Sequence, residues 1–264
     1  MLQAYWNLKG KPFDKTIKCE NLFMSKNFEE LLSRLDYIKN NRGIMLITGL
    51  PGTGKTTALR AFVNQLSDLS FKTFYLPLST VNVNEFYKQL NELIGGEECS
   101  RKSKLFGSIQ KQIIEMVSDF KKIPVIIFDE AHLLKNDNFT ELQILLNFNM
   151  DSSDPAIVIL SGQPHLADRL SRPILRAFYQ RITLKYQLLP LDKDEIKSYI
   201  EHHLKLKGCN DFPFSDNAIE AIYKNTAGIP RITGALALKC LTLCMIEKSK
   251  TITEEHVFGV VHEI

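Results

Sequence analysis

The first two thirds of the chain alternate between short apolar runs and longer segments in which apolar residues recur every three or four positions. Short continuous apolar runs are typical of strands buried on both faces, and the longer spacing is typical of amphipathic helices. The runs predict strands at 44–48, 72–78, 124–129, 156–160 and 182–184, and the spacing predicts helices at 55–69, 83–94, 105–120, 139–148 and 166–178. Strands and helices in this alternation indicate a parallel sheet covered on both faces, which is a three-layer α/β/α domain.

The strand patterns stop after residue 188, and only helical patterns follow. They lie near 192–207, 215–226, 231–247 and 253–262, and Ser215 and Thr253 are the expected N-caps of two of them. We therefore expect three parts: an N-terminal arm and helix packed on the core at 1–40, the α/β domain at 41–188, and a small all-helical lid domain at 189–264.

A glycine-rich segment at Gly49–Thr56 joins the first predicted strand to the helix that follows it, and it fits the pattern G-x-x-x-x-G-K-T in full. Backbone N–H groups of such a loop cradle phosphates, and the helix N-terminus adds its positive dipole. The lysine of the pattern is expected to reach the β- and γ-phosphates of ATP, and the threonine hydroxyl to bind Mg²⁺. The predicted nucleotide-binding residues are Gly49, Pro51, Gly52, Thr53, Gly54, Lys55, Thr56 and Thr57.

Two acids, Asp129 and Glu130, end the third predicted strand. Ligands of parallel sheets bind beyond the carboxyl ends of the strands, so this pair is expected beside the glycine-rich loop. Asp129 would orient the shell of the Mg²⁺ ion, and Glu130 would act as the general base for the attacking water. The sequence thus predicts an ATPase that uses ATP and Mg²⁺ and releases ADP and phosphate.

Composition limits where such a protein works. The chain has 264 residues, of which 44% are hydrophobic and 24% charged, and this balance is ordinary for a globular protein. Its apolar runs are far shorter than the roughly 20 residues that cross a bilayer, and its N-terminus lacks a signal-peptide pattern. We expect a cytoplasmic protein without a membrane partner. The net charge of +3 is too small to indicate nucleic-acid binding by itself.

Further motifs resemble the AAA+ superfamily, and within it the group of ExeA-type ATPases and transposition helpers (IstB, TniB and Mu B-like proteins). The resemblance covers nearly the whole chain. The glycine-rich loop at Gly49–Thr56 (Walker A) and the acid pair Asp129 and Glu130 (Walker B) are its generic part. The resemblance includes, in chain order, Tyr5–Leu8, Lys11–Phe13, Asp129–Leu133, Leu160–Pro164, Leu175–Ile182 and Ala227–Ile232. Its more specific elements are Gly162–Pro164, Gln180–Ile182 and Gly228–Arg231.

The resemblance implies roles for residues around the γ-phosphate. Arg231, just after Pro230, looks like the sensor 2 arginine of the lid. Gln163 lies where sensor 1 belongs, and Ser161 stays an alternative. Arg181 matches the arginine finger that acts on the ATP of a neighbouring subunit, and Arg172 and Arg176 compete for that role. An arginine that acts in trans implies a homo-oligomer, as a ring or a filament.

Three aromatic residues near the N-terminus, Tyr5, Trp6 and Phe13, have two interpretations. Within the resembling family they are candidates to stack near the adenine. Alternatively, they form a hydrophobic clip that packs the N-terminal arm on the core.

The resemblance to stand-alone transposition ATPases implies a protein that oligomerises on double-stranded DNA without strong sequence preference and regulates a transposase. Basic loops contact phosphate without reading bases. The candidate DNA contacts are Thr80, Asn82, Arg101, Lys102 and Lys104, with a second basic string at Lys9, Lys11, Lys15 and Lys18. The alternatives are an ExeA-like secretion-associated ATPase that remodels a protein assembly, a replication initiator or loader, and a scaffold in which ATP only locks an oligomer.

Overall fold

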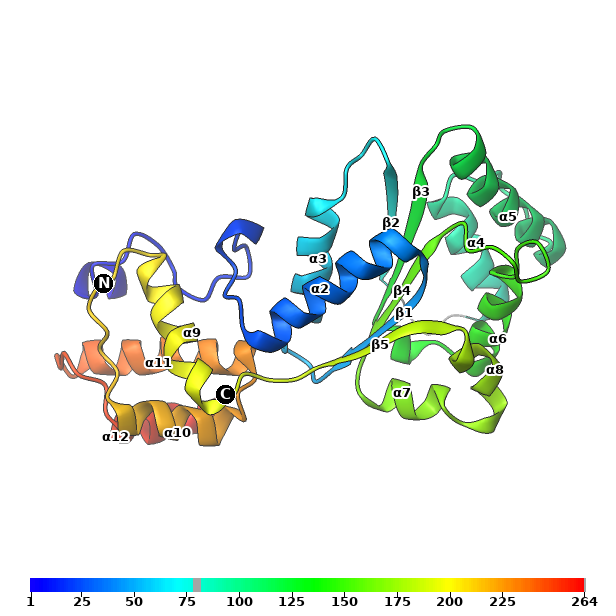
Figure 1. Cartoon of the computed structure of the whole chain (residues 1–264). Coiled ribbons are helices and arrows are strands. Elements are labelled where there is room, and N and C mark those ends of the chain that lie inside the picture. The colour runs from blue at the N-terminus through cyan, green and yellow to red at the C-terminus, as the bar shows by residue number, and fades with distance from the viewer. Residues whose placement is uncertain (78–81, 264) are drawn as a thin grey trace. The chain divides into compact units, whose positions relative to one another are not determined.

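The computed structural model describes residues 1–77 and 82–263, and its five strands form one parallel sheet (Figure 1). The strand order is β2-β3-β4-β1-β5, so β1 lies inside the sheet and β2 and β5 form its edges. The strands are β1 (Gly43–Gly49), β2 (Phe71–Pro77), β3 (Ile123–Asp129), β4 (Ile157–Gly162) and β5 (Ile182–Leu188). Every residue of β1 and β4 is buried, as their continuous apolar sequences predict.

Helices cover both faces of this sheet, which confirms the three-layer α/β/α prediction. Figure 1 shows α2 (Lys26–Asn41) and α3 (Lys55–Gln65) on one face and α4 (Val83–Leu93), α5 (Lys102–Ser118) and α6 (Asn136–Leu145) on the other. The carboxyl ends of β1, β3 and β4 meet at one edge of the sheet, because neighbouring strands are parallel. This edge therefore collects the glycine-rich loop and the acid pair.

The helices predicted at 55–69 and 139–148 end earlier, at Gln65 and Leu145, and two further elements also differ from the prediction. The helix expected at 166–178 is three short pieces, α7 (His165–Leu170), the 3-10 turn η3 (Pro173–Leu175) and α8 (Arg176–Gln180), because proline cannot continue a helix. The last strand, β5, extends to Leu188 rather than 184. Its residues alternate between buried or half-buried and exposed positions, so one face of this edge strand is covered better than the other.

A second part of the fold consists of helices and 3-10 turns from both ends of the chain. It contains α1 (Leu2–Tyr5), the 3-10 turn η1 (Cys19–Asn21), α9 (Lys193–Lys205), α10 (Asp216–Thr226), α11 (Pro230–Ile246), α12 (Glu254–Val260) and the turn η4 (Val261–Glu263). Ser215 caps α10 as predicted, since its hydroxyl accepts the Ala218 N–H at 3.2 Å. The Thr253 N–H donates to His256 Nδ1 at 3.1 Å at the start of α12.

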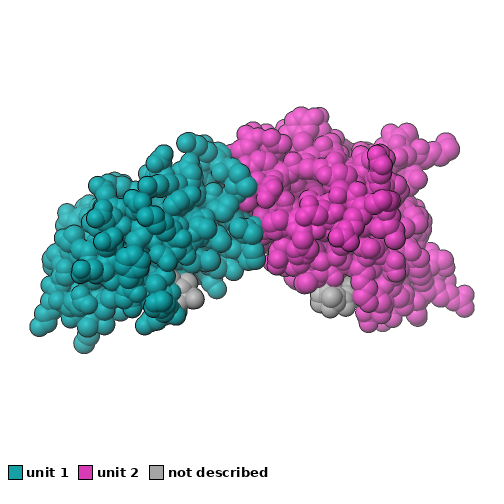
Figure 2. Space-filling view, turned by 90° about the horizontal axis from the view of Figure 1, so that it is seen from below, with its two compact units in different colours: residues 1–29, 50–54, 189–264 teal, residues 30–49, 55–188 magenta. Residues whose placement is uncertain are grey.

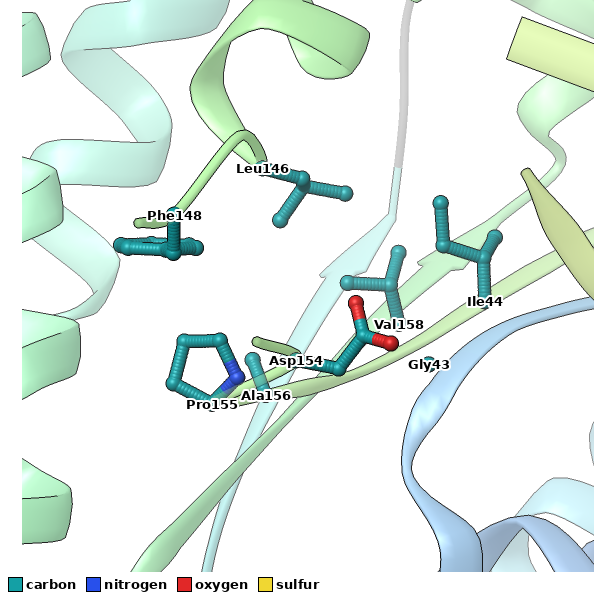
Figure 3. A pocket seen from close by; sticks show the side chains of 8 residues that line it. All are labelled: Gly43, Ile44, Leu146, Phe148, Asp154, Pro155, Ala156 and Val158. Atoms are coloured by element: carbon teal, nitrogen blue, oxygen red, sulfur yellow. The ribbon is translucent and has the colours of Figure 1, made fainter. Parts of the chain in front are cut away.

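Contacts divide the chain into two compact units, coloured separately in Figure 2. The sheet unit comprises residues 30–49 and 55–188. The helical unit comprises residues 1–29, 50–54 and 189–264, so it is assembled from three separate segments. Each unit has its own hydrophobic core.

Candidate active site

The glycine-rich loop between β1 and α3 turns through two glycines with positive φ angles. Gly52 has φ +86° and Gly54 has φ +108°, values that only glycine adopts without strain. Lys55 opens α3 and is buried, and its Nζ donates to the Gly49 carbonyl at 2.9 Å. A buried ammonium at the start of a helix, directly after a glycine-rich turn, is suited to bind phosphate.

The other predicted residues of this loop have local roles. The Thr53 hydroxyl donates to the Leu50 carbonyl at 2.9 Å and so closes the turn. Pro51 is exposed in the loop, and Thr57 is half-buried in the first turn of α3.

The Asp129 carboxylate at the end of β3 is buried and accepts four hydrogen bonds. Oδ2 accepts the Thr56 hydroxyl and the Tyr75 hydroxyl, both at 2.9 Å. Oδ1 accepts the Ser161 hydroxyl at 2.8 Å and the Glu130 backbone N–H at 3.0 Å. Three of these donors come from α3, β2 and β4, and the fourth is the backbone of the residue after β3, so the fold brings three elements to one carboxylate.

Thr56 and Asp129 fit a magnesium ion. Because Thr56 donates its hydroxyl proton to Asp129, its oxygen lone pairs remain available to a cation. A hydroxyl and a carboxylate are both hard oxygen ligands, which is the chemistry that Mg²⁺ prefers. Among the residues that the structure describes, no cluster of three His, Cys, Asp or Glu side chains forms a metal site, so any metal here must share its coordination with phosphates and water.

Glu130 follows Asp129 in the left-handed region, at φ 54° and ψ 32°. Its side chain is 51% exposed, whereas the Asp129 carboxylate is buried. His132 Nδ1 lies 3.3 Å from Glu130 Oε2. Burial lowers the pKa of His132, with smaller opposing and supporting effects from Glu130, His165, Lys55 and Arg169. An exposed carboxylate held beside a neutral imidazole is suited to receive a proton from water.

The two candidates for sensor 1 have different positions. Ser161 is fully buried and bonded to Asp129. Gln163 is half-buried just beyond β4, and its backbone carbonyl accepts the Leu166 N–H at 3.0 Å at the start of α7. Only Gln163 retains side-chain exposure, which a contact to an attacking water requires.

Arg231 lies at the start of α11, directly after Pro230 as predicted. Its backbone N–H points to the Gly52 carbonyl at 3.3 Å, within the helical unit. A Cβ added at Gly52 would come within 2.9 Å of the Arg231 Cβ, so only glycine allows this approach. The Arg231 side chain is exposed.

The predicted finger, Arg181, is bonded within its own chain. Its guanidinium donates to the Gln143 carbonyl at 2.7 Å and the Leu146 carbonyl at 3.2 Å, and it pairs with Asp151. Its competitors Arg172 and Arg176 are exposed. The structure therefore gives Arg181 a local role within its own chain.

The candidate DNA contacts fall into three groups. Thr80 lies outside the described residues. Asn82 caps α4, where its side chain accepts the Glu85 N–H at 3.0 Å, and Lys102 pairs with Glu141. Arg101 and Lys104 are exposed at the start of α5.

The N-terminal aromatic residues pack on the helical unit. Trp6 is buried, and its Nε1 donates to the Leu241 carbonyl at 3.0 Å. The Tyr5 hydroxyl donates to the Ser249 carbonyl at 2.7 Å. The Phe13 ring lies against His203 at 5.0 Å between ring centroids. These contacts favour a packing role over adenine stacking, but they join the arm to the helices of the helical unit and not, as predicted, to the α/β core.

Tyr75 was missed by the sequence analysis. It lies on β2, paired with Ile127, two residues before the register position of Asp129. Side chains alternate between faces with a period of two, so Tyr75 and Asp129 share a face. Only the register between β2 and β3 reveals this, and a single sequence does not contain it.

A five-stranded parallel sheet in this order, with a phosphate-binding loop after β1, an acid pair after β3 and a helical lid, defines an AAA+ P-loop protein. Residues 38–170, slightly more than half of the chain, match the family model described as AAA domain. The chain belongs to this family.

One curated relative and several solved structures are similar to the chain. General secretion pathway protein A of Aeromonas hydrophila is 27% identical over 266 aligned residues, which cover all of this chain and 48% of the relative. The chain thus spans about half the length of that relative. This similarity supports the ExeA-type branch of the resemblance, and nothing in the comparisons supports the transposition branch.

The solved structures support the fold alone, since identities are low. Cdc6p of Pyrobaculum aerophilum has a TM-score of 0.65 at 16% identity, covering 95% of this chain and 68% of its own. A structure of Drosophila ORC bound to DNA has a TM-score of 0.63 at 15% identity, covering 98% and 65%. Within residues 1–77 and 82–263, no helix combines the length and the apolar character needed to span a bilayer.

Proposed function

We propose that the protein binds ATP with Mg²⁺, hydrolyses it, and uses the nucleotide state to remodel a protein assembly, as an ATPase similar to the secretion protein. The observation that carries the ATPase part is the Asp129 carboxylate, bonded to Thr56 of the loop helix and followed by the exposed Glu130. The secretion part is supported by the similarity over the whole chain to General secretion pathway protein A.

Each residue then has a chemical task. Lys55, which is buried, compensates phosphate charge. Thr56 and Asp129 would hold the Mg²⁺ ion that binds together with the nucleotide. A Mg²⁺ ion bound there would supply charge neutralisation for the β- and γ-phosphate oxygens. Glu130 accepts the proton of the attacking water, and Gln163 orients that water. Arg231 contacts the γ-phosphate from the lid.

The ATPase proposal is tested with purified protein and a fluorescent ATP analogue, together with phosphate release in the presence of Mg²⁺. Wild-type protein is expected to bind the analogue and release phosphate, whereas Lys55→Ala loses binding because the phosphates lose their buried counter-charge. Lys193→Ala, an exposed lysine of α9, serves as the matched control. Equal binding by wild type and Lys55→Ala would contradict the proposed site.

DNA is the second candidate partner, in an oligomer that regulates a transposase. The observation in its favour is the exposed pair Arg101 and Lys104 at the start of α5. Anisotropy of a labelled random-sequence duplex, measured with ATP, with ADP and without nucleotide across a salt series, separates the candidates. ATP-dependent binding that weakens with salt would favour DNA. Absence of binding in all three states would leave the protein assembly as the partner.

A further inference from the structure

Asp129 has no acceptor position left for a new donor. An ionised carboxylate offers about four lone-pair sites on its two oxygens. The Thr56 and Tyr75 hydroxyls use Oδ2, and the Ser161 hydroxyl and the Glu130 N–H use Oδ1. A water molecule of the magnesium shell that is to bond to Asp129 must therefore displace one of these four donors.

The four donors differ in how easily they can leave. Ser161 is fully buried, and the Glu130 N–H belongs to the backbone directly after the carboxylate. Thr56 is itself an expected magnesium ligand. Tyr75 is 44% exposed on the edge strand β2, so its side chain can rotate into solvent without disturbing the core.

We propose that Tyr75 is a replaceable donor that occupies the water-binding position of Asp129 until magnesium arrives, so that its hydroxyl competes with the metal shell and sets the magnesium concentration at which ATP binds. The inference rests on the proposed ATPase function. Tyr75 of β2 is then a positioning residue that regulates the binding of Mg²⁺.

The surroundings of Tyr75 fit this role. Burial of its hydroxyl, the hydrogen bond to Asp129 and the nearby carboxylates raise the pKa of Tyr75 to about 12. The side chain therefore remains protonated at neutral pH and keeps the proton that it donates to Asp129. A hydrogen bond to a charged acceptor is strong enough to compete measurably with a water molecule of a metal shell.

The direction of the effect distinguishes competition from support. If Tyr75 only held Asp129 in place, removal of its hydroxyl would weaken magnesium-dependent binding of ATP. If Tyr75 competes, the same removal strengthens it. Tyr75→Phe takes away the hydroxyl and leaves the ring, so the sign of the change is informative.

The test measures binding of a fluorescent ATP analogue at increasing Mg²⁺ concentration for wild type, Tyr75→Phe and Tyr87→Phe. Tyr87 is the matched control, because its hydroxyl also donates to a carboxylate in the sheet unit, that of Glu141 at 3.0 Å. Tyr75→Phe is expected to lower the half-saturating Mg²⁺ concentration by roughly three- to tenfold, and Tyr87→Phe to leave it unchanged. An unchanged or raised value in Tyr75→Phe overturns the proposal.

Two further measurements keep the result specific. Tyr75→Leu, which lacks the ring as well, should match Tyr75→Phe; an effect confined to the leucine variant would mean that the ring, not the hydroxyl, obstructs the site and would overturn the proposal. In protein labelled with fluorotyrosine, the ¹⁹F resonance of Tyr75 should shift on addition of Mg²⁺ and ATP, and a constant resonance would contradict displacement. Failure of wild-type protein to bind the analogue at any Mg²⁺ concentration would instead contradict the ATPase itself.

Discussion

At the scale of single residues, the site separates two neighbouring carboxylates by backbone geometry. Asp129 ends a buried strand with four hydrogen bonds, and Glu130, in a left-handed backbone conformation, has an exposed side chain. A non-glycine residue in that region costs about 1 kcal/mol or more, and such strain is typical of functional sites. In the proposed mechanism, Asp129 serves the bound metal ion and Glu130 accepts a proton.

Glu130→Gln is expected to retain ATP binding and to slow hydrolysis by about a hundredfold or more, because an amide cannot act as the general base. Steady-state phosphate release and binding of a fluorescent analogue check the two parts separately. Glu255→Gln, a change of an exposed acid in α12, is the control. Normal turnover in Glu130→Gln would remove Glu130 from the mechanism.

At the scale of elements, helix α9 contributes the side chains that contact the aromatic residues of the N-terminal arm and the start of α11. Its Tyr199 hydroxyl donates to the Pro230 carbonyl at 3.1 Å at the start of α11. Its His203 is buried against Phe13 and Tyr199, with ring centroids at 5.0 and 4.6 Å. A Cβ added at Gly234 of α11 would lie within 3.1 Å of the Phe13 ring, so the N-terminal arm fits closely on both helices.

The buried His203 makes the stability of the helical unit depend on pH. Burial, with smaller effects of His202 and Lys207, lowers the pKa of His203 to about 4, below its unfolded value. A depressed histidine pKa stabilises the fold above the unfolded pKa of about 6.5, and this contribution is lost as the pH falls to about 4.

Between pH 7 and pH 4, wild-type protein should therefore lose about 3 kcal/mol more unfolding free energy than His203→Gln. Urea unfolding of both proteins at both pH values measures the two losses of unfolding free energy. Subtracting one loss from the other cancels the contribution of the other titrating groups. Equal losses in the two proteins would contradict a buried neutral His203.

At the scale of the whole molecule, the proposed oligomer requires an arginine that reaches a neighbouring subunit. Arg181, the first choice from the sequence, instead ties the end of α6 and Asp151 to α8 within its own chain. Arg176 opens α8 with its side chain exposed. We propose Arg176 as the first candidate for the arginine that acts in trans, with Arg172, which is also exposed, as its competitor.

Arg176→Ala is expected to abolish the part of the ATPase rate that rises with protein concentration, without a change in unfolding free energy. Arg181→Ala is expected to lose about 2 kcal/mol of unfolding free energy, because two backbone carbonyls and a carboxylate lose their donor. Rates across a concentration series and denaturant unfolding measure both variants. A wild-type rate of Arg176→Ala at every concentration would return the finger to Arg181 or Arg172.

The short motifs of the site and the strands of the sheet could be predicted from the sequence. The loop at Gly49–Thr56 and the acids after β3 are short motifs whose chemistry depends on neighbours in the chain, and the strands of the sheet are recognisable as apolar runs. The partners of side chains were not predictable in the same way. Tyr75 meets Asp129 across 54 positions and Lys102 meets Glu141 across 39, and such pairs depend on strand register and helix packing.

The N-terminal arm has a consequence for how the chain is made. Trp6 donates its ring N–H to Leu241, 235 positions later. At the usual speed of synthesis, of about 5–20 residues per second, the ribosome needs roughly ten to fifty seconds to supply that acceptor. Until then, the Trp6 ring N–H has no native acceptor, although the part of α9 that contacts Phe13 is already made. We therefore expect chains released before residue 241 to be the ones that chaperones retain and proteases remove.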